Sequence, residues 1–172
     1  LTILVLSLKD LTNQMHTATN SSKFDISKET ETAKIAKKIS KIIKEGDVLF
    51  FYGDIGVGKT TFIKYLINNL QKTNRSKLTE VTSPTFSIIN EYKVGNTKIL
   101  HYDLYRIKDK KELKNIGLLE NYKDSLSLIE WPELIAKKPK NVINFFFSYE
   151  KNFKKRSITI KNNSKYKINE LR

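Results

Sequence analysis

The residues that most constrain the fold lie between positions 48 and 70. The apolar run VLFFY (48–52) is followed by the loop GDIGVGKT (53–60) and then by TTFIKYLINNL (60–70). A continuous apolar run predicts a strand covered on both faces, and the apolar spacing after the loop predicts a helix. The loop fits the pattern G-x-x-x-x-G-K-[ST] in the strand–loop–helix setting that this pattern requires. The segment therefore predicts a phosphate-binding loop.

Each residue type in this loop has a chemical reason. Glycines let the backbone curl so that its N–H groups point at phosphate oxygens, and the helix that follows adds its positive dipole end. We expect Lys59 to bind the β- and γ-phosphates as a catalytic residue, Thr60 to bind Mg²⁺, and Thr61 to contact the α-phosphate. The other loop residues expected to bind the nucleotide are Gly53, Asp54, Ile55, Gly56, Val57 and Gly58. The guanine-binding pattern N-K-x-D is absent, so ATP is favoured over GTP.

A second carboxylate position is expected at the end of another strand. The segment SLSLIE (125–130) is apolar up to Glu130, and Pro132 stops it. Ligands of open α/β sheets gather at the carboxyl ends of strands, so Glu130 can face the Mg²⁺ held by Thr60. The alternative is a glutamate that simply reaches water. Trp131 lies either beside the nucleotide or at the edge of the core.

Two further motifs carry candidate residues. In HYDLYR (101–106), Asp103 is a candidate catalytic residue that organises Mg²⁺ or an attacking water; it shares one strand face with His101. The alternative is an ordinary charge cluster on a surface strand. In TSPTF (82–86), Ser83 and Thr85 are candidates for sensing the γ-phosphate, as a switch segment does. A plain Ser-Pro turn is the alternative.

The remaining segments complete an α/β pattern. A helix is expected over 27–43, a hairpin of strands over 86–94 and 97–106, a whole or broken helix over 108–122, and a β-pair over 141–150 and 156–162. The fold class predicted is α/β, a three-layer P-loop NTPase-like fold with a mixed central sheet flanked by helices. One domain is expected over 26–165, with an N-terminal extension (1–25) and a C-terminal tail (166–172).

Composition excludes several classes. The chain has no cysteine and two histidines, so it has no disulfides, and a thiolate or histidine metal site is not expected. No apolar run approaches the about 20 residues of a spanning helix, so we expect a cytoplasmic protein without membrane contact. The formal net charge of +14 is compatible with RNA binding. The alternative explanation is a lysine-rich solvated surface that results from an AT-rich genome.

Taken together, GDIGVGKTTF, SPTF, HYDLYR, IGL and IEWPE resemble, in order and spacing, the bacterial TsaE (YjeE) ATPases. The resemblance covers residues 27–133; Val57 and Phe86 depart from the usual alanine and tyrosine. It implies an ATPase required for threonylcarbamoyladenosine (t6A) at position 37 of tRNAs that read codons beginning with A. It further implies ATP and Mg²⁺ as cofactors, weak turnover alone, and activation by TsaD and TsaB, with tRNA reached through that complex. It also places adenine near Glu29 and Thr32.

Two other functions remain open on sequence alone. A small P-loop kinase would have the same size and loop, but such enzymes supply several arginines from a lid, and this chain has four arginines in all. A nucleotide-sensing scaffold without significant turnover would have the same motifs.

Overall fold

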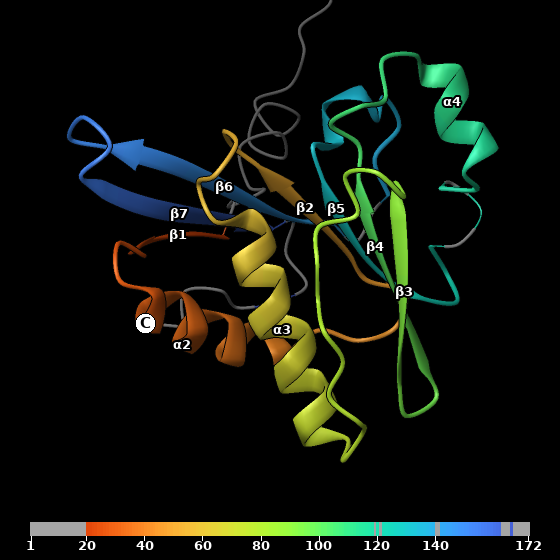
Figure 1. The fold of residues 1–172 in the computed structure, drawn as a ribbon, viewed down its shortest axis with the longest axis horizontal. Coiled ribbons are helices and arrows are strands. Elements are labelled where there is room, and N and C mark those ends of the chain that lie inside the picture. Colours follow the sequence, from red (N-terminus) through yellow and green to blue (C-terminus); the bar gives the residue numbers. More distant parts are fainter. Residues whose placement is uncertain (1–19, 119, 121, 140–141, 163–165, 167–172) are drawn as a thin grey trace, which may run out of the picture.

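The computed structural model describes residues 20–118, 120, 122–139, 142–162 and 166. At its centre is one seven-stranded sheet in the order β1-β7-β6-β2-β5-β4-β3 (Figure 1). Strand β2 is parallel to its neighbours β5 and β6, and β4 is parallel to β5; the other pairs are antiparallel. The strands are β1 (Asn20–Asp25), β2 (Val48–Tyr52), β3 (Ile89–Val94), β4 (Thr97–Asp103), β5 (Leu126–Glu130), β6 (Val142–Glu150) and β7 (Lys155–Asn162).

Helices and loops cover both faces of this sheet, which confirms the predicted class. Helices α2 (Glu29–Ser40) and α3 (Lys59–Thr73) pack side by side on one face (Figure 1). The segment after β4, with the short helix α4 (Lys110–Asn115), and the 3₁₀ turn η1 (Pro132–Leu134) contribute to the other face. Of the two forms expected over 108–122, the structure has the broken helix: α4 ends at Asn115, and Gly117 just after it takes a left-handed conformation (φ 62°).

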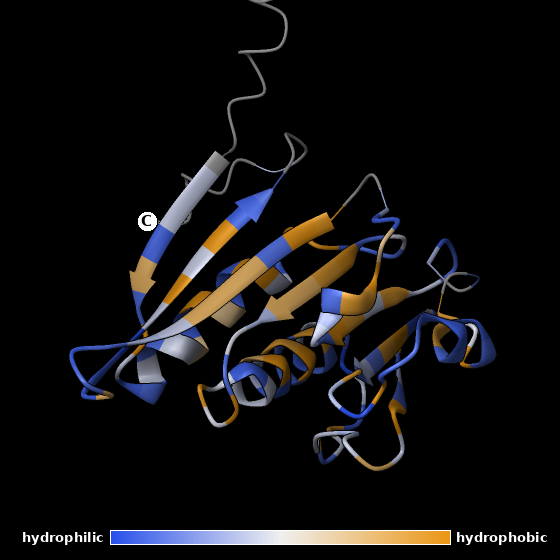
Figure 2. Ribbon diagram, turned by 90° about the horizontal axis from the view of Figure 1, so that it is seen from above, coloured by the Kyte–Doolittle hydropathy of each residue, from blue (hydrophilic) through white to orange (hydrophobic). Residues whose placement is uncertain are grey.

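Strand β2 is apolar throughout because it divides two cores. Leu49 and Phe51 belong to the core beneath α2 and α3, whereas Val48 and Phe50 belong to the core on the opposite face. This alternation is the two-residue period of a strand. Figure 2 shows hydrophobic residues concentrated in these central strands. Burial on both faces holds β2 at the centre of the sheet. The position of β2 in turn determines where the loop that follows it begins.

The edges of the sheet differ from the sequence predictions. Strand β1 pairs with β7 and lies inside the segment assigned to the N-terminal extension. Strand β4 ends at Asp103 instead of continuing to residue 106, because the Asp103 carboxylate accepts the backbone N–H of Tyr105 (3.1 Å) and turns the chain. Strand β3 begins at Ile89, after Ile88 with a φ of 67°. No helix in the part of the chain that the structure describes is long and apolar enough to cross a membrane.

The end of β2 is fixed by Gly53. A Cβ on Gly53 would stand 2.5 Å from the carbonyl oxygen of Phe147 on β6, and its φ is 131°. We expect Gly53→Ala to lower the free energy of unfolding by about 3 kcal/mol or more, through backbone strain and overpacking. Urea denaturation measures this loss.

The matched control is Gly95→Ala in the β3–β4 turn. Gly95 also has a positive φ (59°), but its Cβ would meet its nearest neighbour, Asn74 Oδ1, only at 3.7 Å. Its expected loss is about 1 kcal/mol, from the left-handed backbone alone. Equal losses in the two variants would show that the contact with Phe147 does not matter.

Candidate active site

The loop between β2 and α3 ends at a helix start that no side chain caps. Gly58 is the N-cap of α3, with a φ of 114°, and the helix start has no side-chain cap. The first amides of a helix have no acceptor within the helix. Together with the helix dipole they form an anion-binding position, which is what the sequence predicted for this loop.

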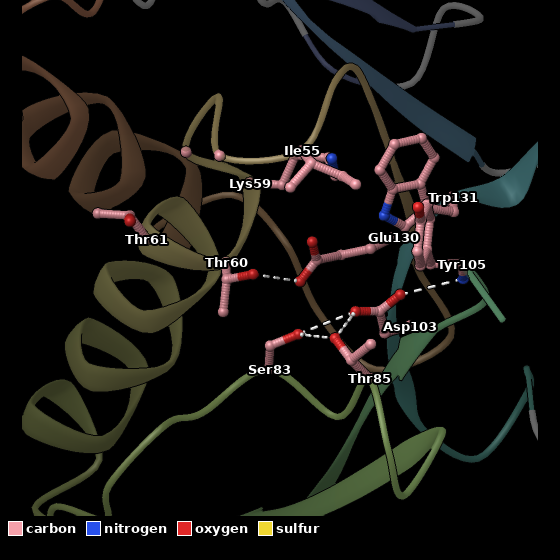
Figure 3. Close-up of a pocket in the computed structure, with 12 residues that line it drawn as sticks. Ile55, Lys59, Thr60, Thr61, Ser83, Thr85, Asp103, Tyr105, Glu130 and Trp131 are labelled. Carbon is pink, nitrogen blue, oxygen red and sulfur yellow. Dashed lines mark hydrogen bonds between the residues drawn. The ribbon is translucent and has the colours of Figure 1, made fainter.

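A pocket of about 280 Å³ opens beside this helix end (Figure 3). It brings together side chains from the loop, from the 82–88 segment and from the ends of β4 and β5. Its lining consists of Ile55, Gly56, Gly58, Lys59, Thr60, Thr61, Ser83, Thr85, Asp103, Tyr105, Glu130 and Trp131. Most of the residues proposed from the sequence are therefore neighbours in space.

Lys59 is buried at the first position of α3, with 4% of its surface exposed. Its Nζ donates hydrogen bonds to the carbonyl oxygens of Gly53 (2.6 Å) and Asp54 (2.9 Å). The same atom lies 3.9 Å from the centre of the Trp131 ring, a cation–π contact. Burial lowers the pKa of Lys59, and the nearby carboxylate of Glu130 opposes that shift. The side chain is thus a buried cation held at the mouth of the loop.

Glu130 lies across the sheet from the loop and reaches Thr60 directly. The Thr60 hydroxyl donates to Glu130 Oε1 (2.8 Å), although the two residues are 70 positions apart. Strands β2 and β5 are parallel neighbours, and this pairing brings the end of β5 beside the loop. Glu130 is 2% exposed. Its other oxygen has no hydrogen bond within the described residues and points into the pocket (Figure 3).

His101 forms a buried hydrogen bond with the Glu130 carboxylate. The imidazole is fully buried, and its Nε2 lies 3.0 Å from Glu130 Oε1. A carboxylate only accepts hydrogen bonds, so Nε2 carries the proton that is shared. The sequence placed His101 on the same face as Asp103, but the pairing with Glu130 depends on the parallel register of β4 with β5. His101 is a positioning residue that sequence reasoning missed.

Asp103 ends the strand next to β5 and anchors the 82–88 segment. Its Oδ2 accepts hydrogen bonds from the hydroxyls of Ser83 (2.8 Å) and Thr85 (2.6 Å). These two hydroxyls lie 2.8 Å from each other. Asp103 is 3% exposed. The alternative interpretation of Asp103 as part of a charge cluster on a surface strand is therefore wrong. Any movement of the segment that carries Ser83 and Thr85 must break bonds to a pocket carboxylate.

Two aromatic residues close one side of the pocket. Trp131 takes a left-handed backbone conformation (φ 58°), and its N–H donates to the carbonyl oxygen of Phe51 (3.2 Å). The ring of Tyr105 lies 4.9 Å from that of Trp131. Tyr105 was not proposed from the sequence; only its place directly after the turn at Asp103 could have indicated it.

Some proposed residues lie outside the pocket. Three loop residues, Gly53, Asp54 and Val57, do not line it: the carbonyl oxygens of Gly53 and Asp54 accept hydrogen bonds from Lys59, and Val57 is buried in the core. Their contacts with a nucleotide stay predictions. On α2, Glu29 accepts a hydrogen bond from the Tyr65 hydroxyl (2.7 Å) and Thr32 is buried. Neither α2 residue lines the pocket, so a nucleotide contact there stays a prediction.

The residues present fit a Mg²⁺–nucleotide. The described residues hold no group of three or more His, Asp or Glu side chains that could bind a metal by themselves. Mg²⁺ in phosphoryl-transfer sites takes one or two protein oxygens and completes its shell with phosphates and waters. The Thr60 hydroxyl and the free Glu130 oxygen supply that number beside the uncapped start of α3.

This arrangement defines a P-loop protein of the α/β class: a glycine loop with a buried lysine, a helix start and two carboxylates at neighbouring strand ends. The comparisons name the family. The family model described as "Threonylcarbamoyl adenosine biosynthesis protein TsaE" matches residues 26–158, so the chain belongs to the TsaE family. The resemblance found in the sequence is confirmed.

Individual relatives agree with this assignment. The protein named tRNA threonylcarbamoyladenosine biosynthesis protein TsaE from Rickettsia felis is 39% identical over 110 residues, 64% of this chain and 62% of that protein. The protein of the same name from Bacillus subtilis is 42% identical over 106 residues, 61% of this chain and 63% of that protein. The chain thus matches less than two thirds of the length of either. The crystal structure of Bacillus subtilis YdiB superposes with a TM-score of 0.70 at 30% identity, covering 89% of this chain and 95% of that one.

Proposed function

We propose that this chain is a Mg²⁺-dependent ATPase required for t6A modification at position 37 of tRNAs that read codons beginning with A. The observation that carries the proposal is the 2.8 Å contact between the Thr60 hydroxyl and Glu130 at the start of α3. The names of the relatives supply the pathway, tRNA threonylcarbamoyladenosine biosynthesis. TsaD and TsaB are the partners proposed, in the cytoplasm, with tRNA reached through their complex.

Each residue of the pocket has a proposed task. Lys59 exchanges its two loop carbonyls for phosphate oxygens, and the first amides of α3 hold the same anion. Thr60 and Glu130 hold Mg²⁺, which neutralises charge on the phosphates when it is bound. Asp103 orients an attacking water, and Ser83 and Thr85 bind its carboxylate until a phosphate competes for their hydroxyls.

The pocket itself supports slow turnover alone. Among the residues that line the pocket, Lys59 is the one cation, and it is buried. Phosphoryl transfer is strongly accelerated by a further cation near the transferred group. A partner that supplies such a group or orders the 82–88 segment would raise the rate. This is the physical basis for proposing activation by TsaD and TsaB.

The test is ATP turnover by the purified chain alone and with TsaD and TsaB added. We expect slow release of phosphate alone and a marked increase with both partners. Turnover unchanged by the partners would favour the nucleotide-sensing scaffold. A phosphorylated product formed from pooled nucleosides would instead support the small kinase.

A further inference from the structure

Arg156, at the start of β7, lies near Gly58 of the phosphate loop. In the sheet, β7 lies on the β6 side of β2, whereas the strands that carry Glu130 and Asp103 lie on the β5 side. The Nη2 of Arg156 donates to the carbonyl oxygen of Ser27 (3.1 Å), just before α2. Its backbone N–H donates to the Ser27 hydroxyl (3.0 Å), and its carbonyl oxygen accepts the N–H of Ile26 (2.9 Å). The backbone of Arg156 and one arm of its side chain are therefore fixed.

The other arm of the guanidinium lies beside the loop. A Cβ built on Gly58, the N-cap of α3, would have Arg156 Nη1 at 3.7 Å as its near neighbour. On the same β6–β7 hairpin, the hydroxyl of Tyr149 would be 3.4 Å from a Cβ on Gly56. The hairpin thus approaches the loop at two of the glycines that line the pocket.

The charge of Arg156 is not matched by a carboxylate. Among the described residues, no Asp or Glu oxygen lies within 4.0 Å of its guanidinium nitrogens. The group is always charged and carries five N–H donors, of which Ser27 takes one. The rest remain available beside a helix start that already favours an anion.

We propose that Arg156 is a second phosphate-binding side chain, which donates to the phosphate chain of the nucleotide from the β7 side while Lys59 binds it from within the loop. The proposal rests on the proposed function, because it needs a nucleotide seated on α3. Arginine suits this task, since its charge is permanent and Nη1 can donate to a phosphate oxygen while Nη2 stays bonded to Ser27. Ser27 then connects the bound phosphates to the start of α2.

The experiment compares Arg156→Gln and Arg156→Lys with the wild type by calorimetric titration of ADP and ATP. Glutamine keeps an N–H donor for Ser27 but loses the charge, whereas lysine keeps the charge. We expect Arg156→Gln to bind about tenfold or more weakly and Arg156→Lys to recover most of that loss. The salt dependence of binding should also fall in Arg156→Gln, because one ionic contact is gone. Lys154→Ala, an exposed lysine at the hairpin tip, is the control.

Thermal unfolding without nucleotide shows whether each variant is folded to the same extent. Binding by Arg156→Gln that equals the wild type would overturn the proposal. Equal weakening of the Gln and Lys variants would also overturn it, since the side chain would then act through its shape and not through its charge. A wild type that binds neither ADP nor ATP would overturn the proposed function together with this inference, so the two failures are distinguishable.

Discussion

Glu130→Ala is expected to leave ATP binding within about threefold of the wild type while reducing Mg²⁺-dependent hydrolysis by about 100-fold or more. The reason is geometric. The Glu130 carboxylate accepts a hydrogen bond from the Thr60 hydroxyl, and its second oxygen points into the pocket. The alanine variant therefore loses one of the two protein oxygens proposed to face Mg²⁺. The loop amides and Lys59, which bind phosphates, are untouched. Single-turnover hydrolysis and direct nucleotide titration separate the two effects.

The controls for this prediction distinguish chemistry from folding. Alanine at 130 leaves the buried His101 N–H without its acceptor, so Glu130→Gln, which keeps an acceptor oxygen, should be measured beside it. Glu133→Ala removes an exposed carboxylate three positions along the chain and should retain wild-type turnover. Hydrolysis that survives in both Glu130 variants would show that this residue does not act on the metal.

Lys59→Ala is expected to weaken ATP binding by about 100-fold or more and thereby to remove turnover at ordinary ATP concentrations. Two hydrogen bonds from a buried ammonium are available for phosphate oxygens in exchange for the carbonyls of Gly53 and Asp54. Charged donors in a buried setting carry more binding free energy than exposed ones. Calorimetric titration measures the affinity.

Lys64→Ala is the matched control, because Lys64 is an exposed lysine on the same helix, α3. It should bind ATP as the wild type does. Lys59 also contacts the Trp131 ring, so thermal unfolding must show that Lys59→Ala is folded before its affinity is interpreted. A folded Lys59→Ala protein with normal affinity would mean that the phosphates are held elsewhere.

The phosphate loop and its flanking strand and helix were predictable because they are local. Residues 48–60 carry the apolar run, the glycines and the lysine in one continuous segment, and the structure has β2, the loop and α3 there. Glu130 was predictable for a different reason: parallel strands end at the same edge of a sheet, so an acid at a strand end reaches the loop.

What the sequence did not indicate depends on register and on contacts between distant segments. The pairing of His101 with Glu130 requires the alignment of β4 with β5. Arg156 lies outside every motif, and it lies beside Gly58 only because β7 pairs with β6, two strands away from β2, which precedes the loop. Tyr105 reaches the pocket because β4 ends sooner than its hydrophobic pattern indicates. The spacing of residues along the chain does not indicate any of these three contacts.

Trp131 has a practical consequence beyond its packing. It is the chain's one tryptophan, and its ring rests on the ammonium of Lys59. Indole emission responds to a neighbouring charge and to water, so any ligand that draws this ammonium away will change the emission of the native protein. Nucleotide binding at this site can therefore be followed by the intrinsic fluorescence of Trp131, without an added dye.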